Sequence, residues 1–347
     1  REFALDLLRV LACFLVIWQH VTEAYYIGPD FTVPTHDSMP LIGWMNSMTP
    51  IEVPLFVMIS GYFLLPLKMD VGAFFKRRFT RILIPFVVWC VAYSAYFMAY
   101  RGDTLAQFLR NVAHIPVNLG VEIGHMWFIY MLLGLYMLVP IISPWLEQCS
   151  KRQLQGYLGV WAFTTLLPYI HLWFPEVWGE CFWNPTPMLH YFTGFAGYFL
   201  LGYYIKRYGA LSVRNALLLL VGGYLFTVAV YQYRLDRVTL VSDLEVCWRF
   251  CSLNMMLMTY AMFSLVSRVK WQGNNAIGRW ISSYAVLSYA VYFVHIMLIN
   301  FWRDLLSESL AHVYYQIPII TLCSFLSSYA VVWVLSKLPK AKVWLGS

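Results

Sequence analysis

Charged residues are scarce in this chain. Asp, Glu, Lys and Arg together make up 12% of its 347 residues, whereas hydrophobic residues make up 61%. A soluble domain carries about 25% charged residues, and a single globular core does not grow large enough to bury so much apolar surface. The composition therefore excludes a soluble enzyme, a disordered chain and a fibrous protein, and it indicates an integral membrane protein with several spans.

Motifs that hold metals or disulfides are also missing. The seven cysteines, at positions 13, 90, 149, 181, 247, 251 and 323, form no Cys-x-x-Cys pair, and most lie in apolar segments. They are predicted to be buried hydrophobic side chains, and we expect no metal site. No linker or internal repeat divides the sequence, so we expect one membrane domain over residues 1–347. Because the chain begins at Arg1 without a Met, we expect a short N-terminal piece to precede this numbering.

Long apolar segments are abundant instead. A helix needs about 20 mostly apolar residues to cross a bilayer, and unbroken runs of this kind exclude the alternating pattern of a membrane β-barrel. We predict an all-α polytopic membrane protein, a bundle of about ten transmembrane helices. The predicted spans lie near residues 5–26, 44–65, 82–100, 123–145, 154–173, 188–205, 214–232, 245–267, 281–302 and 315–336.

The distribution of Lys and Arg predicts the orientation of this bundle, because cytoplasmic loops are enriched in basic residues. With the N-terminus inside, 18 of the 24 basic residues fall on the inner side. The other six are Arg101, Arg110, Arg234, Arg237, Arg249 and Arg303. We therefore expect both termini in the cytoplasm (N-in/C-in). The net charge of +7 is then mainly a signal of topology, and we expect membrane lipid, not nucleic acid, around the protein.

Polar residues in the first predicted span form one stripe. Asp6, Arg9, Cys13, His20 and Glu23 recur at helical spacing, and Arg9 and His20 lie within about 20° of each other at 100° per residue. His20 is then roughly 16 Å deeper than Arg9 along the helix. Because polar groups within a bilayer are costly, the stripe predicts an inward-facing functional surface. A hydrogen bond from His20 to a neighbouring helix is the structural alternative.

A basic segment precedes the third predicted span. Arg78 and Arg81 are three residues apart and share a helix face. Together with Arg9 they would form a cytoplasmic cluster for a phosphorylated ligand, because Arg grips phosphate with paired donors. The alternative is that these residues only set the topology and bind anionic lipid headgroups.

Three further ionisable residues fall at the predicted depth of His20. Glu52, Arg249 and His295 each lie roughly 8–12 Å below the outer surface of their spans. Four ionisable groups from four spans at one depth predict a buried site. Each also has a structural explanation, because Glu52 can pair with Arg249 in a buried ion pair and His295 can be satisfied as a neutral tautomer.

At these residues the sequence resembles the acyltransferase-3 family of integral membrane O-acyltransferases. The matching pieces occur in family order and cover most of the chain. They are Asp6-Leu7-Leu8-Arg9 followed by His20; Val53-Pro54-Leu55-Phe56 running into Ser60-Gly61-Tyr62-Phe63; Arg78-x-x-Arg81 with Pro85; His125-Met126-Trp127-Phe128 leading to Tyr136 and Pro140; and Ser288-x-x-x-Tyr292-x-x-His295. Within the family the sequence is most similar to the branch that O-acetylates surface polysaccharides, such as the enterobacterial common antigen type.

The resemblance implies a ten-helix bundle in a bacterial inner membrane. It implies an acyl donor, acetyl-CoA, on the cytoplasmic side and an acceptor hydroxyl, on a surface glycan or its lipid-linked precursor, on the outer side. The essential histidine of the family corresponds to His20, and its essential arginines correspond to Arg9, Arg78 and Arg81. The family's acidic residue before the Phe of the second span is Pro54 here, and Glu52 is the nearest acid.

The residues themselves are consistent with that reaction. Arg9, Arg78 and Arg81 would hold the CoA phosphates, and the arm of CoA would extend along the stripe toward His20. His20 would act as general base on the acceptor hydroxyl, or would carry the acyl group itself. Glu52 would orient the imidazole. The oxyanion or the acceptor would be bound by side chains among His125, Trp127, Arg249 and His295.

Three other functions fit part of this pattern. A polysaccharide or lipid-linked sugar exporter would need a wider aqueous path and would have no reason to bind acyl-CoA. A membrane acyltransferase of another class would pair a His with a distant Asn and act on lipid or protein. A non-enzymatic membrane sensor would not need Arg9 and His20 on one face. Binding of CoA separates these alternatives, whereas the sequence leaves the oligomeric state open.

Overall fold

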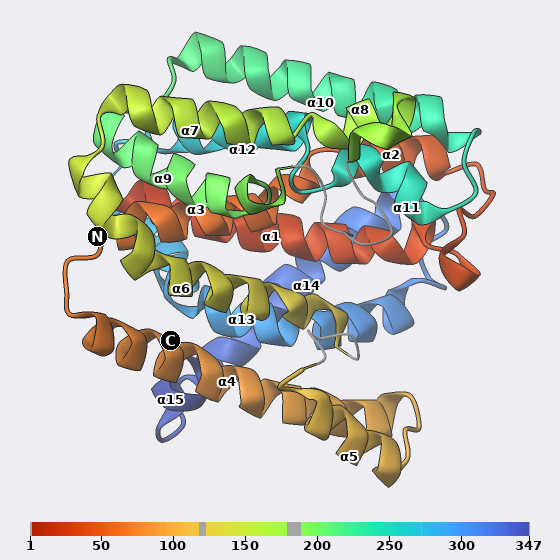
Figure 1. Ribbon diagram of the computed structural model, residues 1–347. Coiled ribbons are helices and arrows are strands. Elements are labelled where there is room, and N and C mark those ends of the chain that lie inside the picture. The colour runs from red at the N-terminus through yellow and green to blue at the C-terminus, as the bar shows by residue number, and fades with distance from the viewer. Residues whose placement is uncertain (1, 118–122, 179–188, 272, 347) are drawn as a thin grey trace.

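The computed structural model describes residues 2–117, 123–178, 189–271 and 273–346, and in these residues it contains helices but no extended strand (Figure 1). The α-helices are α1 (Phe3–Tyr26), α2 (Met39–Asn46), α3 (Glu52–Leu64), α4 (Val71–Tyr100), α5 (Leu105–His114), α6 (Trp127–Gln148), α7 (Lys151–Thr164), α8 (Leu167–Trp173), α9 (Ala196–Tyr208), α10 (Val213–Leu235), α11 (Val241–Leu244), α12 (Leu253–Val266), α13 (Ala276–Leu306), α14 (Val313–Leu335) and α15 (Ala341–Leu345). Short 3-10 turns cover Pro29–Phe31, Thr49–Ile51, Gly124–Met126, Pro175–Trp178, His190–Phe192 and Glu245–Trp248.

Seven segments of the described chain are long and apolar enough to cross a membrane. They are Phe3–Tyr26, Met39–Leu64, Val71–Tyr100, Gly124–Gln148, Val213–Leu235, Ala276–Leu306 and Val313–Leu335, and each overlaps one predicted span. The other three predicted spans correspond to α7 with α8, to α9 and to α12. Helices α9 and α12 have 13 and 14 residues, so each is only about 20 Å long, less than the roughly 30 Å of a hydrocarbon core. The count of ten crossings stays a prediction.

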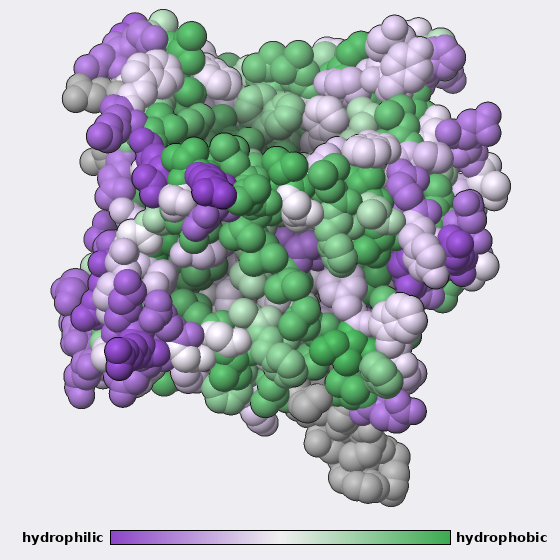
Figure 2. Space-filling view, turned by 90° about the horizontal axis from the view of Figure 1, so that it is seen from above, coloured by the Kyte–Doolittle hydropathy of each residue, from purple (hydrophilic) through white to green (hydrophobic). Residues whose placement is uncertain are grey.

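The surface has the pattern of a membrane protein. Figure 2 shows hydrophobic residues over the middle of one face and hydrophilic residues gathered at its left and right ends. Large apolar side chains are exposed along the outer helices, for example Val87 of α4, Ile141 of α6 and Leu218 of α10. Because the helices run between the two hydrophilic ends, this apolar belt is the surface that lipid would cover.

Both chain ends lie toward the same end of the bundle, at the left in Figure 1. The start of α4 and the junction between α6 and α7 lie at this end too. An even number of crossings places the termini on one side, so the arrangement is compatible with the predicted topology. That this side is the cytoplasm stays a prediction, based on the basic residues.

The second predicted span is broken into pieces. Helix α2 ends at Asn46, a 3-10 turn spans Thr49–Ile51, and α3 begins at Glu52. Pro50 has no backbone N–H to continue a helical ladder, which favours a break at this point. Glu52 is therefore the first residue of a helix, not a residue eight positions into one, and the dipole at the start of α3 favours negative charge there.

Helix α1 lies in the middle of the bundle and packs against α3, α13 and α14 (Figure 1). Helix α3 in turn crosses α9 closely at two glycines. A Cβ on Gly61 would lie 1.9 Å from the carbonyl oxygen of Phe199, and a Cβ on Gly202 would lie 2.0 Å from that of Met58. Small residues allow two backbones to approach in this way, so the crossing fixes where α3 holds its side chains against α1.

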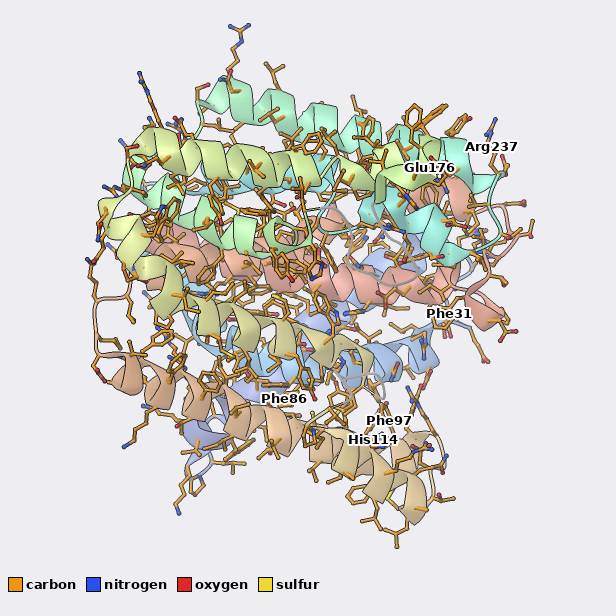
Figure 3. The ribbon with its side chains drawn as sticks, in the orientation of Figure 1. Phe31, Phe86, Phe97, His114, Glu176 and Arg237 are labelled. Atoms are coloured by element: carbon orange, nitrogen blue, oxygen red, sulfur yellow. The ribbon has the colours of Figure 1, made fainter. Side chains whose placement is uncertain are left out.

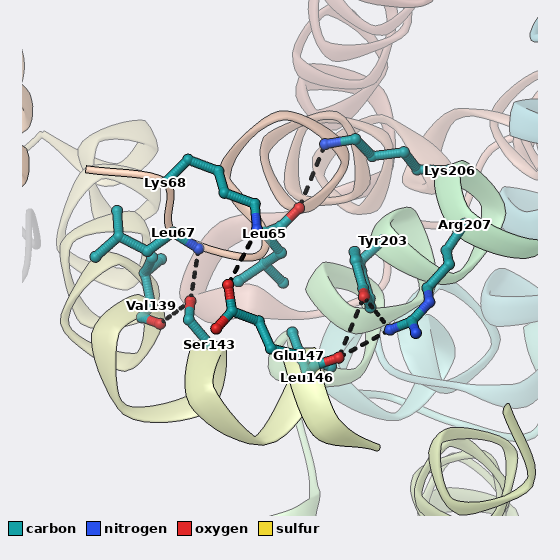
Figure 4. Close-up of polar contacts among 10 residues, drawn as sticks. All are labelled: Leu65, Leu67, Lys68, Val139, Ser143, Leu146, Glu147, Tyr203, Lys206 and Arg207. Atoms are coloured by element: carbon teal, nitrogen blue, oxygen red, sulfur yellow. Dashed lines mark hydrogen bonds and ion pairs between the residues drawn. The ribbon is translucent and has the colours of Figure 1, made fainter. Parts of the chain in front are cut away.

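The loop between α3 and α4 is held by the ends of two other helices (Figure 4). The backbone N–H of Leu67 donates to Oγ of Ser143 at 2.8 Å, and Nζ of Lys206 donates to the carbonyl of Leu65 at 3.3 Å. Ser143 belongs to α6 and Lys206 to α9. These bonds fix the start of α4, and with it the helical turns that carry Arg78 and Arg81.

Six of the seven cysteines are described, and none of the six forms a disulfide. Cys13, Cys90, Cys149 and Cys247 are buried, whereas Cys251 and Cys323 are partly exposed. Cys181 lies outside the described residues.

Candidate active site

Three histidines from distant parts of the chain meet within the bundle. His20 lies on α1, His125 in the turn before α6, and His295 on α13. The ring centroids of His20 and His295 are 5.3 Å apart, those of His125 and His295 5.2 Å, and those of His20 and His125 6.4 Å. In the described part of the chain, no group of His, Cys, Asp and Glu side chains has the geometry to hold a metal ion.

His20 has the environment of a general base. Its Nδ1 lies 2.8 Å from Oε2 of Glu23, one turn along α1. A carboxylate only accepts hydrogen bonds, so Nδ1–H is the donor and the lone pair is left on Nε2. The side chain of His20 is 22% exposed, whereas His295 is fully buried and His125 nearly so. Of the three rings, His20 is the one with the most surface available to a reactant.

The other two histidines are held by Tyr292. Nδ1–H of His295 donates to the carbonyl of Tyr292, and the Tyr292 hydroxyl donates to the carbonyl of His125. Nε2 of His125 and Nε2 of His295 are buried and have no hydrogen-bond partner among the described residues. Buried polar atoms are normally satisfied, so both nitrogens are candidates to contact a bound molecule.

A cavity of about 200 Å³ opens beside His20, and we call it the histidine chamber. Its lining comprises Val16, Gln19, His20, Glu23, Glu52, Val53, Phe56, His125, Trp127, Phe128, Glu245, Phe250 and Tyr292. Glu52 is 2% exposed, and its Oε2 has no partner among the described residues. Trp127 stacks on Phe250 at a centroid distance of 5.6 Å. Both predicted residues, Glu52 and Trp127, therefore share a chamber with His20.

The acid that contacts His20 is nevertheless Glu23, not Glu52. Glu23 is three residues from His20 on the same helix, a spacing that brings side chains together on one face. Glu52 lies at the start of α3 and makes no ion pair with His20 or Arg249 in the described residues. Glu23 belongs to the polar stripe of the first predicted span. The family motif, however, has its acidic residue in the second span, so Glu52 was the predicted partner of His20.

The three predicted arginines line one larger cavity of about 490 Å³, the arginine cavity. Arg9 comes from α1, and Arg78 and Arg81 come from α4. NH1 of Arg9 donates to Asp6 at 3.1 Å, and Nε of Arg81 donates to the carbonyl of Gly346 at 3.1 Å. Nε of Arg78 is buried without a hydrogen-bond partner among the described residues. Three cations in one cavity make a site for an anion with several charges.

Three aromatic side chains lie on the boundary between the arginine cavity and the histidine chamber, and we call them the constriction. Phe56 of α3, Phe128 of α6 and Tyr292 of α13 line both spaces. The rings of Phe56 and Phe128 are 6.1 Å apart, and those of Phe128 and Tyr292 are 5.6 Å apart. Sequence reasoning missed this constriction, because aromatic residues are common in every span and only the fold brings these three together.

Arg249 lines a third cavity of about 350 Å³ next to the histidine chamber, and we call it the outer cavity. The two spaces share Gln19, Glu245 and Phe250, and Oη of Tyr26 donates to Oε1 of Glu245 at 2.7 Å. Arg249 does not lie within a helix of the predicted eighth span, and the prediction that it shares the depth of His20 stays a prediction. The predicted eighth span begins as a 3-10 turn, and α12 starts only at Leu253, so Arg249 is an exposed residue of a non-helical segment.

His114 lies apart from this site. His114 ends α5, which together with the outer part of α4 forms an arm that stands away from the bundle (Figure 3). Phe97 of α4 belongs to the same arm (Figure 3), and the guanidinium of Arg101 lies 3.8 Å from the centroid of its ring. The arm therefore contributes no lining residue to the three cavities described above.

The comparisons with known proteins agree with this description at the level of the family. Neither the curated proteins nor the solved structures contain a match to the chain. Residues 2–337 match the acyltransferase domain that defines the acyltransferase-3 family, which is nearly the whole chain and includes every residue placed in the three cavities except Gly346. With its seven apolar helices, this chain is a multi-pass membrane protein that belongs to the acyltransferase-3 family.

Proposed function

We propose that the protein is an O-acyltransferase of the bacterial inner membrane. It would move an acyl group, acetyl, from acetyl-CoA on the cytoplasmic side to a hydroxyl of a surface glycan or its lipid-linked precursor on the outer side. The observation that carries the proposal is the series of three cavities, in which adjacent cavities share lining residues. They run from Arg9, Arg78 and Arg81 past His20 to Arg249.

The arginine cavity has the chemistry to bind the donor. CoA carries its phosphates at one end and its thioester at the other end of a long, thin arm. Arg9, Arg78 and Arg81 would bind the phosphates by charge-assisted hydrogen bonds. His20 lies eleven residues after Arg9 on α1, roughly 16 Å along the helix. The arm would extend between the rings of Phe56, Phe128 and Tyr292, which suit a narrow chain.

His20 would act as the general base in the histidine chamber. Nε2 accepts the proton of the acceptor hydroxyl while its oxygen bonds to the thioester carbonyl carbon. The carbon–sulfur bond then breaks, and the proton passes to the sulfur to give CoA and the O-acyl product. Glu23 holds Nδ1–H and stabilises the imidazolium that forms in between. The unpartnered Nε2 atoms of His125 and His295 belong to rings whose centroids lie 6.4 and 5.3 Å from that of His20, and they would contact the reactants.

The outer cavity would hold the acceptor. Its lining combines aromatic side chains, among them Phe195, Trp248 and Phe250, with the polar side chains of Gln19, Glu245 and Arg249. Apolar walls with a few convergent polar groups are typical of sites for small organic ligands. A sugar presents an apolar ring face and several hydroxyls, so this lining suits a glycan better than a lipid tail.

Export of a sugar chain fits the same geometry less well. The histidine chamber has a volume of about 200 Å³, below the roughly 300–1,000 Å³ of usual ligand pockets, and Phe56, Phe128 and Tyr292 narrow it on one side. A path for a polysaccharide would have to be wider than this.

Purified protein in vesicles tests the proposal directly. Acetyl-CoA is supplied on the side of the arginine cavity and a surface glycan on the other, and the acetylated glycan and free CoA are measured. We expect both products in equal amounts from the wild-type protein and neither from His20→Gln, while both proteins bind CoA in calorimetry. Absence of CoA binding by the wild-type protein would refute the donor and with it the proposed function.

A further inference from the structure

A small recess lies next to the histidine chamber. It has a volume of about 10 Å³ and is lined by Cys13, Val16, Ile17, Phe56, Val291, Tyr292 and His295. The surface that these side chains present to it is apolar. It has room for about one water-sized sphere, and its apolar surface offers a water molecule no hydrogen-bond partner. The space is therefore suited to one small apolar group.

This space is adjacent to the reaction centre. It shares Val16, Phe56 and Tyr292 with the histidine chamber, and it is bounded by His295, whose ring lies 5.3 Å from that of His20. Phe56 and Tyr292 also belong to the constriction through which a donor would extend. A group that passes Phe56 and Tyr292 from the arginine cavity would therefore come next to both the small space and the histidine chamber.

We propose that this space is the acyl-methyl pocket, which receives the methyl group of the donor and restricts the enzyme to acetyl-CoA. The inference rests on the proposed function and adds to it the side chains that would exclude acyl groups longer than acetyl. With the methyl group between Val16, Ile17 and Val291, the carbonyl carbon of the thioester faces the histidine chamber and His20. A propionyl group carries one more carbon, for which a volume of about 10 Å³ leaves little room.

The walls of the pocket are rigid enough to act as a size limit. Ile17 and Val291 are each 1% exposed, and both are β-branched residues with one strongly preferred rotamer in a helix. They come from α1 and α13, two helices that pack directly against each other. An additional methylene would therefore have to displace packed side chains, and a single methylene typically changes specificity by about 10- to 200-fold.

The test compares acyl-CoA donors of increasing length. The ratio of kcat/KM for acetyl-CoA to that for propionyl-CoA is measured for wild type, for Val291→Ala and for Val294→Ala. Val294 is the matched control, because it is 2% exposed on the same helix and lines none of the cavities described. We expect a wild-type ratio of at least about ten, a fall of about tenfold or more in Val291→Ala, and no change in Val294→Ala. Because a ratio is measured, a partial loss of folded protein does not affect it.

Two further variants test the pocket if Val291→Ala does not fold. Ile17→Val removes one methylene from the other wall and should lower the same ratio in the same direction. Val291→Leu should lower acetyl transfer at least about tenfold while CoA affinity is retained, because the larger side chain fills the pocket.

The outcomes separate this inference from the proposed function. Transfer of acetyl and propionyl at equal rates by the wild type refutes the pocket but leaves the acyltransferase in place. An equal shift of the ratio in Val291→Ala and Val294→Ala refutes it as well. Failure of the wild type to bind CoA or to transfer any acyl group refutes both.

Discussion

Nδ1 of His20 lies 2.8 Å from Oε2 of Glu23, and the two residues are one turn apart on α1. This contact engages Nδ1 and leaves Nε2 for the proposed base role, and it makes Glu23 the acid to test first. We expect His20→Gln to lower acetyl transfer by about 10²–10⁴-fold, the usual contribution of a positioned base. CoA affinity should be unchanged, because the arginines lie in a different cavity. Calorimetry with CoA and an assay of CoA release measure the two effects.

The two carboxylates near His20 differ in their expected effects. Glu23→Gln keeps an acceptor for Nδ1–H but loses the charge that stabilises an imidazolium, so the rate should fall about tenfold or more, by less than in His20→Gln. Glu52→Gln should lower the rate less than Glu23→Gln, since Glu52 does not contact His20. If Glu52→Gln lowered the rate more than Glu23→Gln, Glu52 would be the residue that orients His20.

The arginine cavity predicts a second set of effects, on donor binding. Replacing Arg78 and Arg81 together by Ala should weaken CoA binding by about 100-fold or more, because each charge-assisted contact is worth about 1.5–3 kcal/mol. Arg77→Ala is the matched control. It removes the same charge from the same helix, but Arg77 is exposed and lines none of the described cavities.

Dephospho-CoA supplies a further comparison for the same variants. If the arginines bind phosphate, the double variant should lose less affinity for dephospho-CoA than for CoA, because dephospho-CoA lacks one phosphate. Unchanged CoA affinity in the Arg78→Ala, Arg81→Ala double variant would leave these residues with a role in topology only.

The sequence predicted the parts of the site that depend on helical periodicity. The stripe of α1 and the pair Arg78 and Arg81 follow from 3.6 residues per turn, and the structure places Arg9 with that pair in one cavity. The positions of Glu52 and Arg249 were predicted less well, because both lie where a long apolar run is broken into short helices. Hydropathy predicts that a segment lies in the membrane, but it does not predict where a helix within that segment begins.

The constriction and the proposed acyl-methyl pocket could not be predicted from the sequence for a different reason. Phe56, Phe128 and Tyr292 belong to α3, α6 and α13, and each sits in a segment rich in other aromatic residues. Which of these rings meet depends on the rotation of each helix against its neighbours. That rotation is set by packing, such as the glycine crossing of α3 and α9, and not by the pattern of any single span.

The predicted topology can be measured with single cysteines. Thr35→Cys lies in the segment between α1 and α2, and Lys151→Cys lies at the start of α7, toward the opposite end of the bundle. With the N-terminus inside, a membrane-impermeant thiol reagent added to intact cells should label position 35 and not position 151. The protein without an added cysteine gives the background from its own thiols. Labelling of position 151 alone would invert the orientation and would place the arginine cavity on the outer side.

The crossing of α3 and α9 predicts a loss of stability that reaches the active site. Gly61→Ala places a Cβ 1.9 Å from a backbone oxygen of α9, and backbone cannot move aside as a side chain can. We expect a destabilisation of about 1–3 kcal/mol, the usual cost of overpacking, seen as a lower Tm in detergent. Gly222→Ala on α10 is the control, because nothing lies within 4 Å of its added Cβ and Ala is the better helix former by about 1 kcal/mol.

Gly202→Ala should have a similar effect, since its Cβ meets the backbone of Met58 on the other side of the same crossing. The double variant should cost less than the sum of the two, because helices already pushed apart by one methyl group have room for the second. Helix α3 also carries Glu52 and Phe56 into the histidine chamber, so acetyl transfer should fall in both single variants even where the protein stays folded. Full activity with a lowered Tm would mean that the crossing supports the fold without setting the geometry around His20.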